Sequence, residues 1–372
     1  MPKKILIIAG EASGDLYGAH LVSAIKKRDP KAEFLGVGGA EMKKAGVDII
    51  YPIDELAIIG FFEIFSKIKI IKNLFFLLSE KIKEQNFDLA ILVNYPGFNL
   101  SFAGVLKKKR IPVVFYSSPQ VWAWGKWRLR RIKRFVDKMI VLLKFEEEFY
   151  KKHGIDAEFV GHPLVDIVKP AGSALGIEKD EHTKIISLVP GSRKSEIKTL
   201  FPTMLKAAER IHLKQGDVRF LITKHPQLPL EIYKDALEGY SLPLKIVDGK
   251  IYDCLHISDL AVVVSGSVTL EATILKTPMI IINRLSLLTG ILYLIFVRLA
   301  NVGLVNIIAG KRIMPEFLQY SATACNIANE ALSILSDDNK YKKMKEDLET
   351  LNHIVGPPGA SDRAAAIISK II

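Results

Sequence analysis

A chain of 372 residues is too long for one ordinary hydrophobic core, so its length predicts two domains. With 49% hydrophobic and 25% charged residues, its composition is that of a globular protein and excludes a disordered chain. The formal net charge of +12 indicates anionic partners, and since the sequence contains no nucleic-acid-binding module, these are phosphorylated ligands or an acidic membrane surface.

Short apolar runs with strand character alternate with amphipathic, helix-like stretches from one end of the chain to the other. In the first half, the runs expected to form buried parallel strands are residues 5–9, 33–37, 89–93, 113–116 and 139–143. After a pause over residues 161–174, a second series follows at residues 185–189, 219–223, 244–247, 260–264 and 279–282. Two such series predict an α/β chain of two Rossmann-like, doubly wound domains that face each other across a cleft.

The pause in the pattern places the first domain at residues 1–165 and the second at residues 166–350. No strand follows the helical residues 351–372, and we expect this C-terminal segment to pack back on the first domain. The basic and apolar start of the chain resembles a secretory signal, but the apolar run is short and is followed at once by polar residues. We therefore interpret it as a buried first strand.

Ligands of doubly wound sheets bind beyond the carboxyl ends of the strands, so the loop after the first strand is the first candidate site. This loop, residues 10–15, reads Gly-Glu-Ala-Ser-Gly-Asp. Its glycines allow a sharp turn and, with Ser13 and Gly14, it presents amides to an anion at a helix start. An ordinary strand–helix turn in which Asp15 caps the helix is an equally open interpretation.

The second domain opens in the same way at residues 187–193. Gly191 and Ser192 can present amides to a phosphate, and Arg193 supplies a fixed cation for a diphosphate. In the alternative, Ser192 caps a helix and Arg193 is solvated. A diphosphate gives the better reason for an arginine at this position.

A further loop with phosphate-binding character follows the run 260–264. Its residues Ser265, Gly266 and Ser267 can hold phosphate at a helix start, and Glu271, one turn further on, can accept hydrogen bonds from ribose hydroxyls. In the alternative, these are only polar groups near a helix cap. Because one domain contains two loops of this kind, the pattern favours a nucleotide.

Metal and cofactor chemistry have no support in the spacing of the polar residues. The chain has no Asp-x-Asp arrangement of the type that metal-dependent sugar transferases use, and no His, Cys or Asp cluster with ligand spacing. We therefore predict no metal and no cofactor, so that Arg193, amides and helix ends neutralise the diphosphate. The two cysteines, Cys254 and Cys325, form no disulfide framework, which indicates a reducing cytoplasm.

Eight stretches, spread over most of the chain, carry a specific resemblance. They are residues 10–15, 36–39, 96–99, 121–124, 160–163, 188–193, 265–267 and 306–310. In this order they closely resemble the lipid-A-disaccharide synthase family, inverting glycosyltransferases of the GT-B fold. The resemblance implies that 2,3-diacylglucosamine passes from its UDP conjugate to the 6-hydroxyl of 2,3-diacylglucosamine 1-phosphate, giving a β-1′,6-linked disaccharide 1-phosphate and UDP.

The resemblance also assigns the two substrates to the two domains. UDP belongs in the C-terminal domain, with Arg193, Ser267, Glu271 and Asn306 around the donor. The acceptor belongs in the N-terminal domain, where the matching stretches contain further candidate residues. These are Ser13, Gly14, Asn99, Trp122 and Trp124.

One position departs from the family pattern. The family has an aspartate, the favoured base for the acceptor hydroxyl, where this chain has Asn94. A neutral amide does not accept a proton at neutral pH. Three interpretations stay open: Asn94 only positions the acceptor, another carboxylate (Glu11 or Asp15) is the base, or catalysis is impaired.

Three segments are candidates for contact with a membrane. Residues 60–82 carry an apolar helical face bordered by lysines, which suits a helix on an anionic membrane surface, although a core helix with a solvated face is the usual interpretation. Residues 285–297 are apolar but shorter than the roughly 20 residues that span a bilayer. The basic residues within 126–134, beside tryptophans, form either a solvated helix face or a contact for phosphate head groups. We expect a cytoplasmic protein held peripherally on the inner face of the cytoplasmic membrane.

Two other classes of function compete with this assignment. One is another GT-B enzyme that acts on UDP-N-acetylglucosamine, either a lipid-linked transferase or a 2-epimerase. The other is a catalytically impaired homologue that only binds lipid or nucleotide, which Asn94 would explain. The oligomeric state stays open, a homodimer included.

Overall fold

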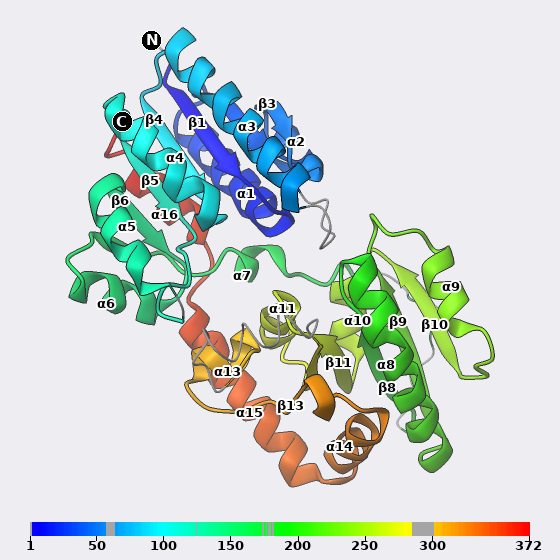
Figure 1. The fold of residues 1–372 in the computed structure, drawn as a ribbon. Helices are drawn as coiled ribbons and strands as arrows, with labels where there is room; N and C mark the ends of the chain where they lie inside the picture. The colour runs from blue at the N-terminus through cyan, green and yellow to red at the C-terminus, as the bar shows by residue number, and fades with distance from the viewer. Residues whose placement is uncertain are drawn as a thin grey trace. The chain divides into compact units, whose positions relative to one another are not determined.

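In a computed structural model the chain forms two compact units (Figure 1). Unit 1 comprises Met1–Val165 and Val355–Ile372, and unit 2 comprises Asp166–Ile354. The structure describes residues 2–56, 64–123, 125–172, 175, 177, 180, 182–284 and 301–372. Each unit is built around one parallel sheet, so the predicted fold class of two doubly wound α/β domains is confirmed.

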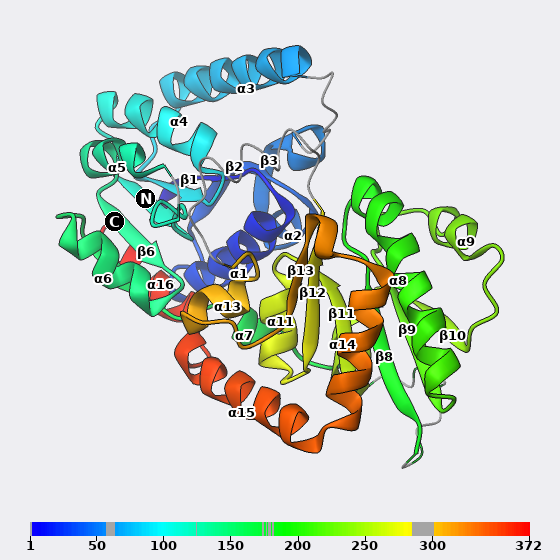
Figure 2. The ribbon, with the colours of Figure 1, turned by 60° about the horizontal axis from the view of Figure 1, so that its bottom comes forward.

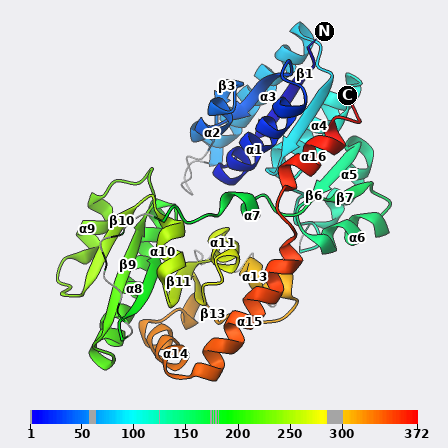
Figure 3. The ribbon, with the colours of Figure 1, turned by 180° about the vertical axis from the view of Figure 1, so that it is seen from behind.

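Unit 1 contains a seven-stranded sheet with the order β3-β2-β1-β4-β5-β6-β7. Its strands are β1 Lys4–Ala9, β2 Glu33–Gly38, β3 Val47–Pro52, β4 Leu89–Val93, β5 Val113–Tyr116, β6 Lys138–Val141 and β7 Ala157–Phe159. The central strands are continuous apolar runs because helices cover both faces of the sheet. Figure 2 shows α3 Ile64–Glu84 and α4 Pro96–Lys108 on one face, and Figure 3 shows α1 Ala12–Arg28 and α16 Ala360–Ile368 on the other.

The remaining helices of unit 1 are short. They are α2 Ala40–Lys44, α5 Leu129–Phe135, α6 Lys144–Lys152 and α7 Leu164–Ile167, with 3₁₀ turns at Ile53–Glu55 and Lys126–Arg128. The C-terminal helix α16 packs against α1, and Arg363 fixes the start of this segment by donating from Nε to the Val160 carbonyl at 2.8 Å.

Unit 2 contains a six-stranded sheet with the order β10-β9-β8-β11-β12-β13. Its strands are β8 Lys184–Val189, β9 Val218–Lys224, β10 Leu244–Asp248, β11 Leu260–Val264, β12 Met279–Asn283 and β13 Glu316–Leu318. Its helices are α8 Lys194–Lys214, α9 Glu231–Leu237, α10 Ile251–Ile257, α11 Val268–Ile274, α13 Leu304–Ala309, α14 Ala324–Ser336 and α15 Asp338–Val355, with a 3₁₀ turn at Gln319–Ser321. Helix α14 packs against α8.

The strand orders locate the two places where a ligand is expected. In unit 1 the order reverses between β1 and β4, and in unit 2 between β8 and β11. At such a switch point the two following loops diverge to opposite faces of the sheet and leave a crevice at the carboxyl ends of the strands. The loops singled out in the sequence follow these four strands.

Helix α3 combines the two interpretations of residues 60–82. Leu74 and Leu78 are fully buried in the core of unit 1, as a core helix requires, whereas Ile68, Ile71 and Phe76 are exposed. Residues 57–63, which include the predicted start of the helix, lie outside the described residues, as does the apolar segment 285–297. Among the described helices, none is both long and apolar enough to cross a membrane.

Candidate functional site

The first loop and the loop after β4 meet at the switch point of unit 1. Ala9 pairs with Val93 at the ends of β1 and β4, so Glu11 and Asn94 leave the sheet side by side. The Asn94 side-chain amide donates a hydrogen bond to Glu11 Oε1, and the Ser13 hydroxyl donates to the same oxygen at 3.2 Å. Three of the predicted residues are thus brought together around one exposed carboxylate.

The turn that presents Asn94 is strained. Asn94 and Tyr95 both have left-handed backbones, with φ of 49° and 48°, which asparagine tolerates but which is rare for tyrosine. Packing holds the turn in place, because the Tyr95 ring lies against Gly10, where a Cβ would be 2.2 Å from Tyr95 Cγ. Burial and the nearby negative charge of Glu11 raise the pKa of Tyr95. Strain held in this way is typical of functional sites.

Asn99 supports the strained turn from inside the sheet. Its side chain is fully buried, and Nδ2 donates to the carbonyls of Asn94 at 2.7 Å and Val93 at 3.3 Å. In this structure the Asn99 side chain therefore helps to hold the turn at Asn94, and its predicted contact with the acceptor stays a prediction.

Asp15 has a structural role that the sequence did not place correctly. Its buried carboxylate accepts hydrogen bonds from the amides of Gly39 at 2.7 Å, Met42 at 3.0 Å and Glu41 at 3.0 Å. It therefore caps α2 rather than its own helix α1. The oxygens of Asp15 are occupied by three backbone amides, whereas the Glu11 carboxylate is exposed at this edge. Gly14 is buried beside Ala9 and Val93.

A carboxylate that sequence analysis missed holds Trp122. Glu146 Oε1 accepts hydrogen bonds from Trp122 Nε1 at 3.1 Å and Ser118 Oγ at 2.8 Å. Only 3% of Glu146 is exposed, and this burial raises its pKa to about 7. The available sequence signal was a glutamate three residues into a helix that follows a strand, the position of a capping box. Trp124 lies outside the described residues.

The Arg193 loop of unit 2 binds an anion from its own chain. Glu196 Oε2 accepts hydrogen bonds from the amides of Ser192 at 3.0 Å and Arg193 at 3.2 Å, and Glu196 Oε1 accepts from Arg193 Nη1 at 2.9 Å. Gly191 has a φ of 111°, and a Cβ there would lie 2.3 Å from Glu196 Oε2. The amides predicted to bind phosphate thus hold a carboxylate in this structure, while the Arg193 side chain is 67% exposed.

The Ser265 loop starts beside the Arg193 loop, because β11 and β8 are neighbours in the sheet. Ser265 Oγ donates to the Val302 carbonyl at 3.4 Å, and Gly266 and Ser267 are exposed. Burial raises the pKa of Glu271 to about 7, although a hydrogen bond from Ser267 opposes the shift. The two predicted anion loops are therefore adjacent at the switch point of unit 2.

Asn306 organises a loop through its side-chain amide. Its Nδ2 donates to the Met314 carbonyl at 2.8 Å and to Glu316 Oε1 at 2.6 Å, and its Oδ1 accepts from the amides of Ile313 at 2.8 Å and Met314 at 2.9 Å. These four bonds use the whole hydrogen-bonding capacity of the amide in this structure, and the predicted contact with the donor stays a prediction. Glu316, which sequence analysis also missed, accepts from the Gly303 amide at 3.0 Å as well.

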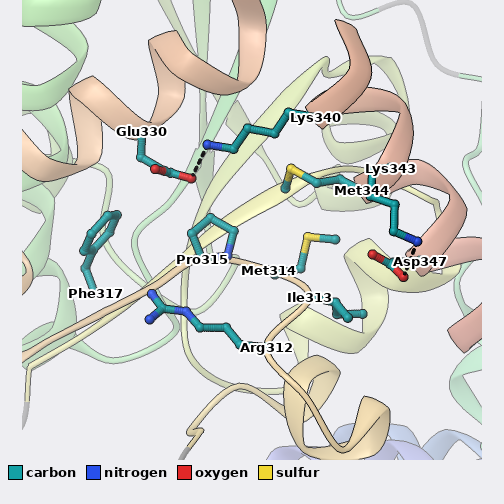
Figure 4. A pocket seen from close by; sticks show the side chains of 10 residues that line it. All are labelled: Arg312, Ile313, Met314, Pro315, Phe317, Glu330, Lys340, Lys343, Met344 and Asp347. Carbon is teal, nitrogen blue, oxygen red and sulfur yellow. Dashed lines mark hydrogen bonds and ion pairs between the residues drawn. The ribbon is translucent and has the colours of Figure 1, made fainter. Parts of the chain in front are cut away.

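A cavity of about 510 Å³ lies elsewhere in unit 2 (Figure 4). Its wall includes Pro315, which directly precedes β13, and its rim carries the ion pairs Lys340–Glu330 at 2.8 Å and Lys343–Asp347 at 3.2 Å. It therefore opens toward the amino end of β13, whereas the predicted site residues follow the carboxyl ends of strands. None of the predicted site residues lines it.

Comparison with known proteins gives one consistent result. The family model described as lipid-A-disaccharide synthetase matches residues 5–370. The lipid-A-disaccharide synthase of Syntrophus aciditrophicus is 42% identical over 377 aligned positions, covering 100% of this chain and 98% of that protein, and the one of Trichlorobacter lovleyi is 37% identical with the same coverage.

Solved structures that resemble the chain share its fold at low sequence identity. The UDP-GlcNAc 2-epimerase of Neisseria meningitidis, bound to UDP-GlcNAc, has a TM-score of 0.68 at 12% identity, covering 99% of this chain and 100% of that one. The calicheamicin glycosyltransferase CalG4 has a TM-score of 0.65 at 11% identity, covering 100% and 98%. These likenesses concern the two-domain architecture alone.

Proposed function

Because the chain belongs to the lipid-A-disaccharide synthase family and is therefore a glycosyltransferase, we propose that unit 1 takes the sugar acceptor and unit 2 the UDP-linked donor. The enzyme transfers 2,3-diacylglucosamine from UDP to the 6-hydroxyl of 2,3-diacylglucosamine 1-phosphate. The observation that supports this division is that the predicted loops after β1 and β4 in unit 1, and after β8 and β11 in unit 2, lie where the order of each sheet reverses.

In the proposed reaction, Glu11 is the base. Its carboxylate takes the proton of the acceptor hydroxyl while that oxygen forms a bond to the anomeric carbon of the donor. The bond from this carbon to the diphosphate breaks on the opposite side, and UDP leaves with the electron pair, stabilised by Arg193. The Asn94 amide, which donates to Glu11, orients the carboxylate.

One assay tests this function against its competitors. Purified protein is given UDP-2,3-diacylglucosamine with the acceptor present or omitted, and both UDP and disaccharide are measured. We expect the two products in equal amounts and only when the acceptor is present. Conversion of UDP-N-acetylglucosamine without an acceptor would identify an epimerase, and binding without turnover would identify an impaired homologue.

Donor binding is expected to weaken at acid pH because of Glu271. The proposed hydrogen bonds from the ribose hydroxyls are strongest when the carboxylate is ionised. Because its pKa is raised to about 7, protonation below this pH weakens them. Affinity for a UDP-sugar, whose diphosphate does not titrate in this range, should therefore fall several-fold between about pH 8 and about pH 6. Glu271→Gln should bind weakly at both pH values, and an unaltered pH dependence in this variant would contradict the assignment.

We propose that the protein binds peripherally to the inner face of the cytoplasmic membrane, where diacylated substrates reside. Helix α3 supports this with exposed apolar side chains between lysines: Ile68 is 45%, Ile71 37% and Phe76 68% exposed. Trp127 is 63% exposed, with the Arg128 guanidinium 5.1 Å from its ring centroid. Apolar side chains bordered by cations are suited to the surface of an anionic bilayer.

Membrane binding is expected to depend on these side chains and on salt. Replacing Ile68, Ile71 and Phe76 together with serine should reduce sedimentation with anionic vesicles several-fold, and high salt should release much of the natural protein. Leu213→Ser is the matched control, because Leu213 is an 80% exposed apolar side chain of unit 2. If the triple variant loses its circular dichroism and unfolds, α3 belongs to the core and this assignment fails.

A further inference from the structure

The loop after β5 stands next to the strained turn at Asn94. The backbone N–H of Asn94 donates a hydrogen bond to the carbonyl of Tyr116, the last residue of β5, at 3.0 Å. The chain then turns at Ser117, which has a left-handed φ of 65°, and continues to Trp122. Tyr150 of α6 holds the middle of this loop by donating from its hydroxyl to the Pro119 carbonyl at 2.7 Å.

Glu146 is the buried polar centre of this loop. Its carboxylate accepts hydrogen bonds from the side chains of Ser118 and Trp122 and, at 3.3 Å, from the Leu143 amide. These partners and the Leu142 backbone, which also interacts with the carboxylate, are neutral, although buried carboxylates are usually paired with cations. A side chain that only filled space here would be less costly as an uncharged residue.

The bond to Glu146 also fixes how Trp122 can meet a ligand. Its indole N–H is used by the carboxylate, and Phe145 contacts it in a T-shaped arrangement with ring centroids 5.0 Å apart. Trp122 is nevertheless only partly buried. The part of Trp122 that can contact a ligand is therefore the surface of its indole ring, which suits the apolar face of a sugar ring.

We propose that Glu146 is a positioning residue that holds Trp122 as a stacking platform for the acceptor glucosamine beside Glu11 and Asn94. This inference rests on the proposed function, because it assigns the acceptor to unit 1. Glu146 is thereby added to the residues of the acceptor site, and it acts on the acceptor only through Trp122.

The titration of Glu146 gives the platform a measurable property. Its pKa is raised to about 7 by burial, so the carboxylate is ionised above this pH and protonated below it. Protonation removes the charge that strengthens its hydrogen bonds to the loop. The groups that face it are Ser118, Trp122 and the backbone of Leu142 and Leu143, none of which titrates in this range, and Tyr150, whose pKa is raised by burial and by Glu146. Trp122 is therefore held firmly at about pH 8 and less firmly at about pH 6.

The test uses Trp122 as its own reporter. The chain has three tryptophans, so Trp124→Phe with Trp127→Phe leaves Trp122 as the single fluorophore. Its emission should change with a midpoint near pH 7, and Glu146→Gln should abolish this change. Quenching by 2,3-diacylglucosamine 1-phosphate in micelles should show roughly tenfold weaker acceptor binding in Glu146→Gln, since the hydrogen bond that Trp122 donates to a charged group is lost. UDP affinity should stay unchanged.

Two further variants separate positioning from folding. Glu147→Gln is the matched control, because Glu147 is the next residue on α6 and pairs with Lys144 and Lys151 instead of the loop. If Glu146→Gln does not fold, Ser118→Ala replaces it, and loss of this donor should move the midpoint to higher pH. The inference is overturned if the Trp122 titration survives in Glu146→Gln, if it stays at the same midpoint in Ser118→Ala, or if acceptor binding is unaltered. Normal acceptor binding without disaccharide would instead contradict the proposed function.

Discussion

Arg193→Ala is expected to weaken UDP binding by roughly 10- to 100-fold and to remove most turnover. A charged hydrogen bond contributes roughly 1.5–3 kcal/mol, and each 1.4 kcal/mol corresponds to about tenfold in affinity. Arg193 stands at the start of α8 with a 67% exposed side chain, and its guanidinium and amide already hold a carboxylate. A diphosphate presents the same chemistry with more charge, so it should displace Glu196 from this position.

The Arg193 experiment has a control in the adjacent residue. Lys194 is an exposed cation at the same helix start, and Lys194→Ala should change UDP affinity little if position rather than net charge matters. Calorimetric titration with UDP and turnover are measured for both variants. Equal losses would indicate general electrostatic attraction, and unchanged UDP affinity in Arg193→Ala would remove this residue from the donor site. Turnover should also survive EDTA if the arginine takes the role that a metal has in other transferases.

The central strands could be predicted from sequence because each is a continuous apolar run. Residues 89–93, 113–116 and 260–264 were predicted to the residue. The strands that were missed, β3, β7 and β13, lie at or next to sheet edges. They are short or carry exposed polar residues, since one side faces solvent, and so lack the apolar run.

The loops that form the site could be predicted from sequence, because the carboxyl ends of neighbouring parallel strands meet at one edge of the sheet. The roles of individual polar residues were not, because they depend on partners distant in sequence. Asp15 bonds to amides 24 to 27 residues away, and Glu146 to a tryptophan 24 residues away. Asn306 was predicted near the donor, and its bonds to the loop after α13 could not be foreseen from sequence. Nothing in local propensity records such pairings.

The proposal that Glu11 is the base leads to a second prediction with a large expected effect. A positioned base commonly contributes about 10²–10⁴-fold to rate, so Glu11→Gln should reduce turnover by that order while leaving UDP affinity unchanged. Asp15→Asn should behave differently. Because Asp15 caps α2 with three hydrogen bonds, its loss should lower the melting temperature, and folded protein assayed at lower temperature should keep most of its turnover.

The Asn94→Asp variant tests whether a carboxylate at position 94 can serve as the base as well as one at position 11. In the natural chain the Asn94 amide donates to Glu11, so a weak to moderate rate should come from Glu11 alone, and a second carboxylate should raise turnover. The added charge lies within hydrogen-bond reach of Glu11, so the pair will share a proton and the pH optimum should move up.

The decisive protein carries Glu11→Gln and Asn94→Asp together, which exchanges carboxylate and amide while keeping the hydrogen bond between them. It should recover much of the rate that Glu11→Gln loses, because a carboxylate then stands where the family resemblance implies the base. If Glu11→Gln works at full speed and Asn94→Asp changes nothing, the acceptor does not bind at the switch point of unit 1. If the natural protein is inactive until Asn94 becomes aspartate, Glu11 is not a base and the chain is an impaired homologue.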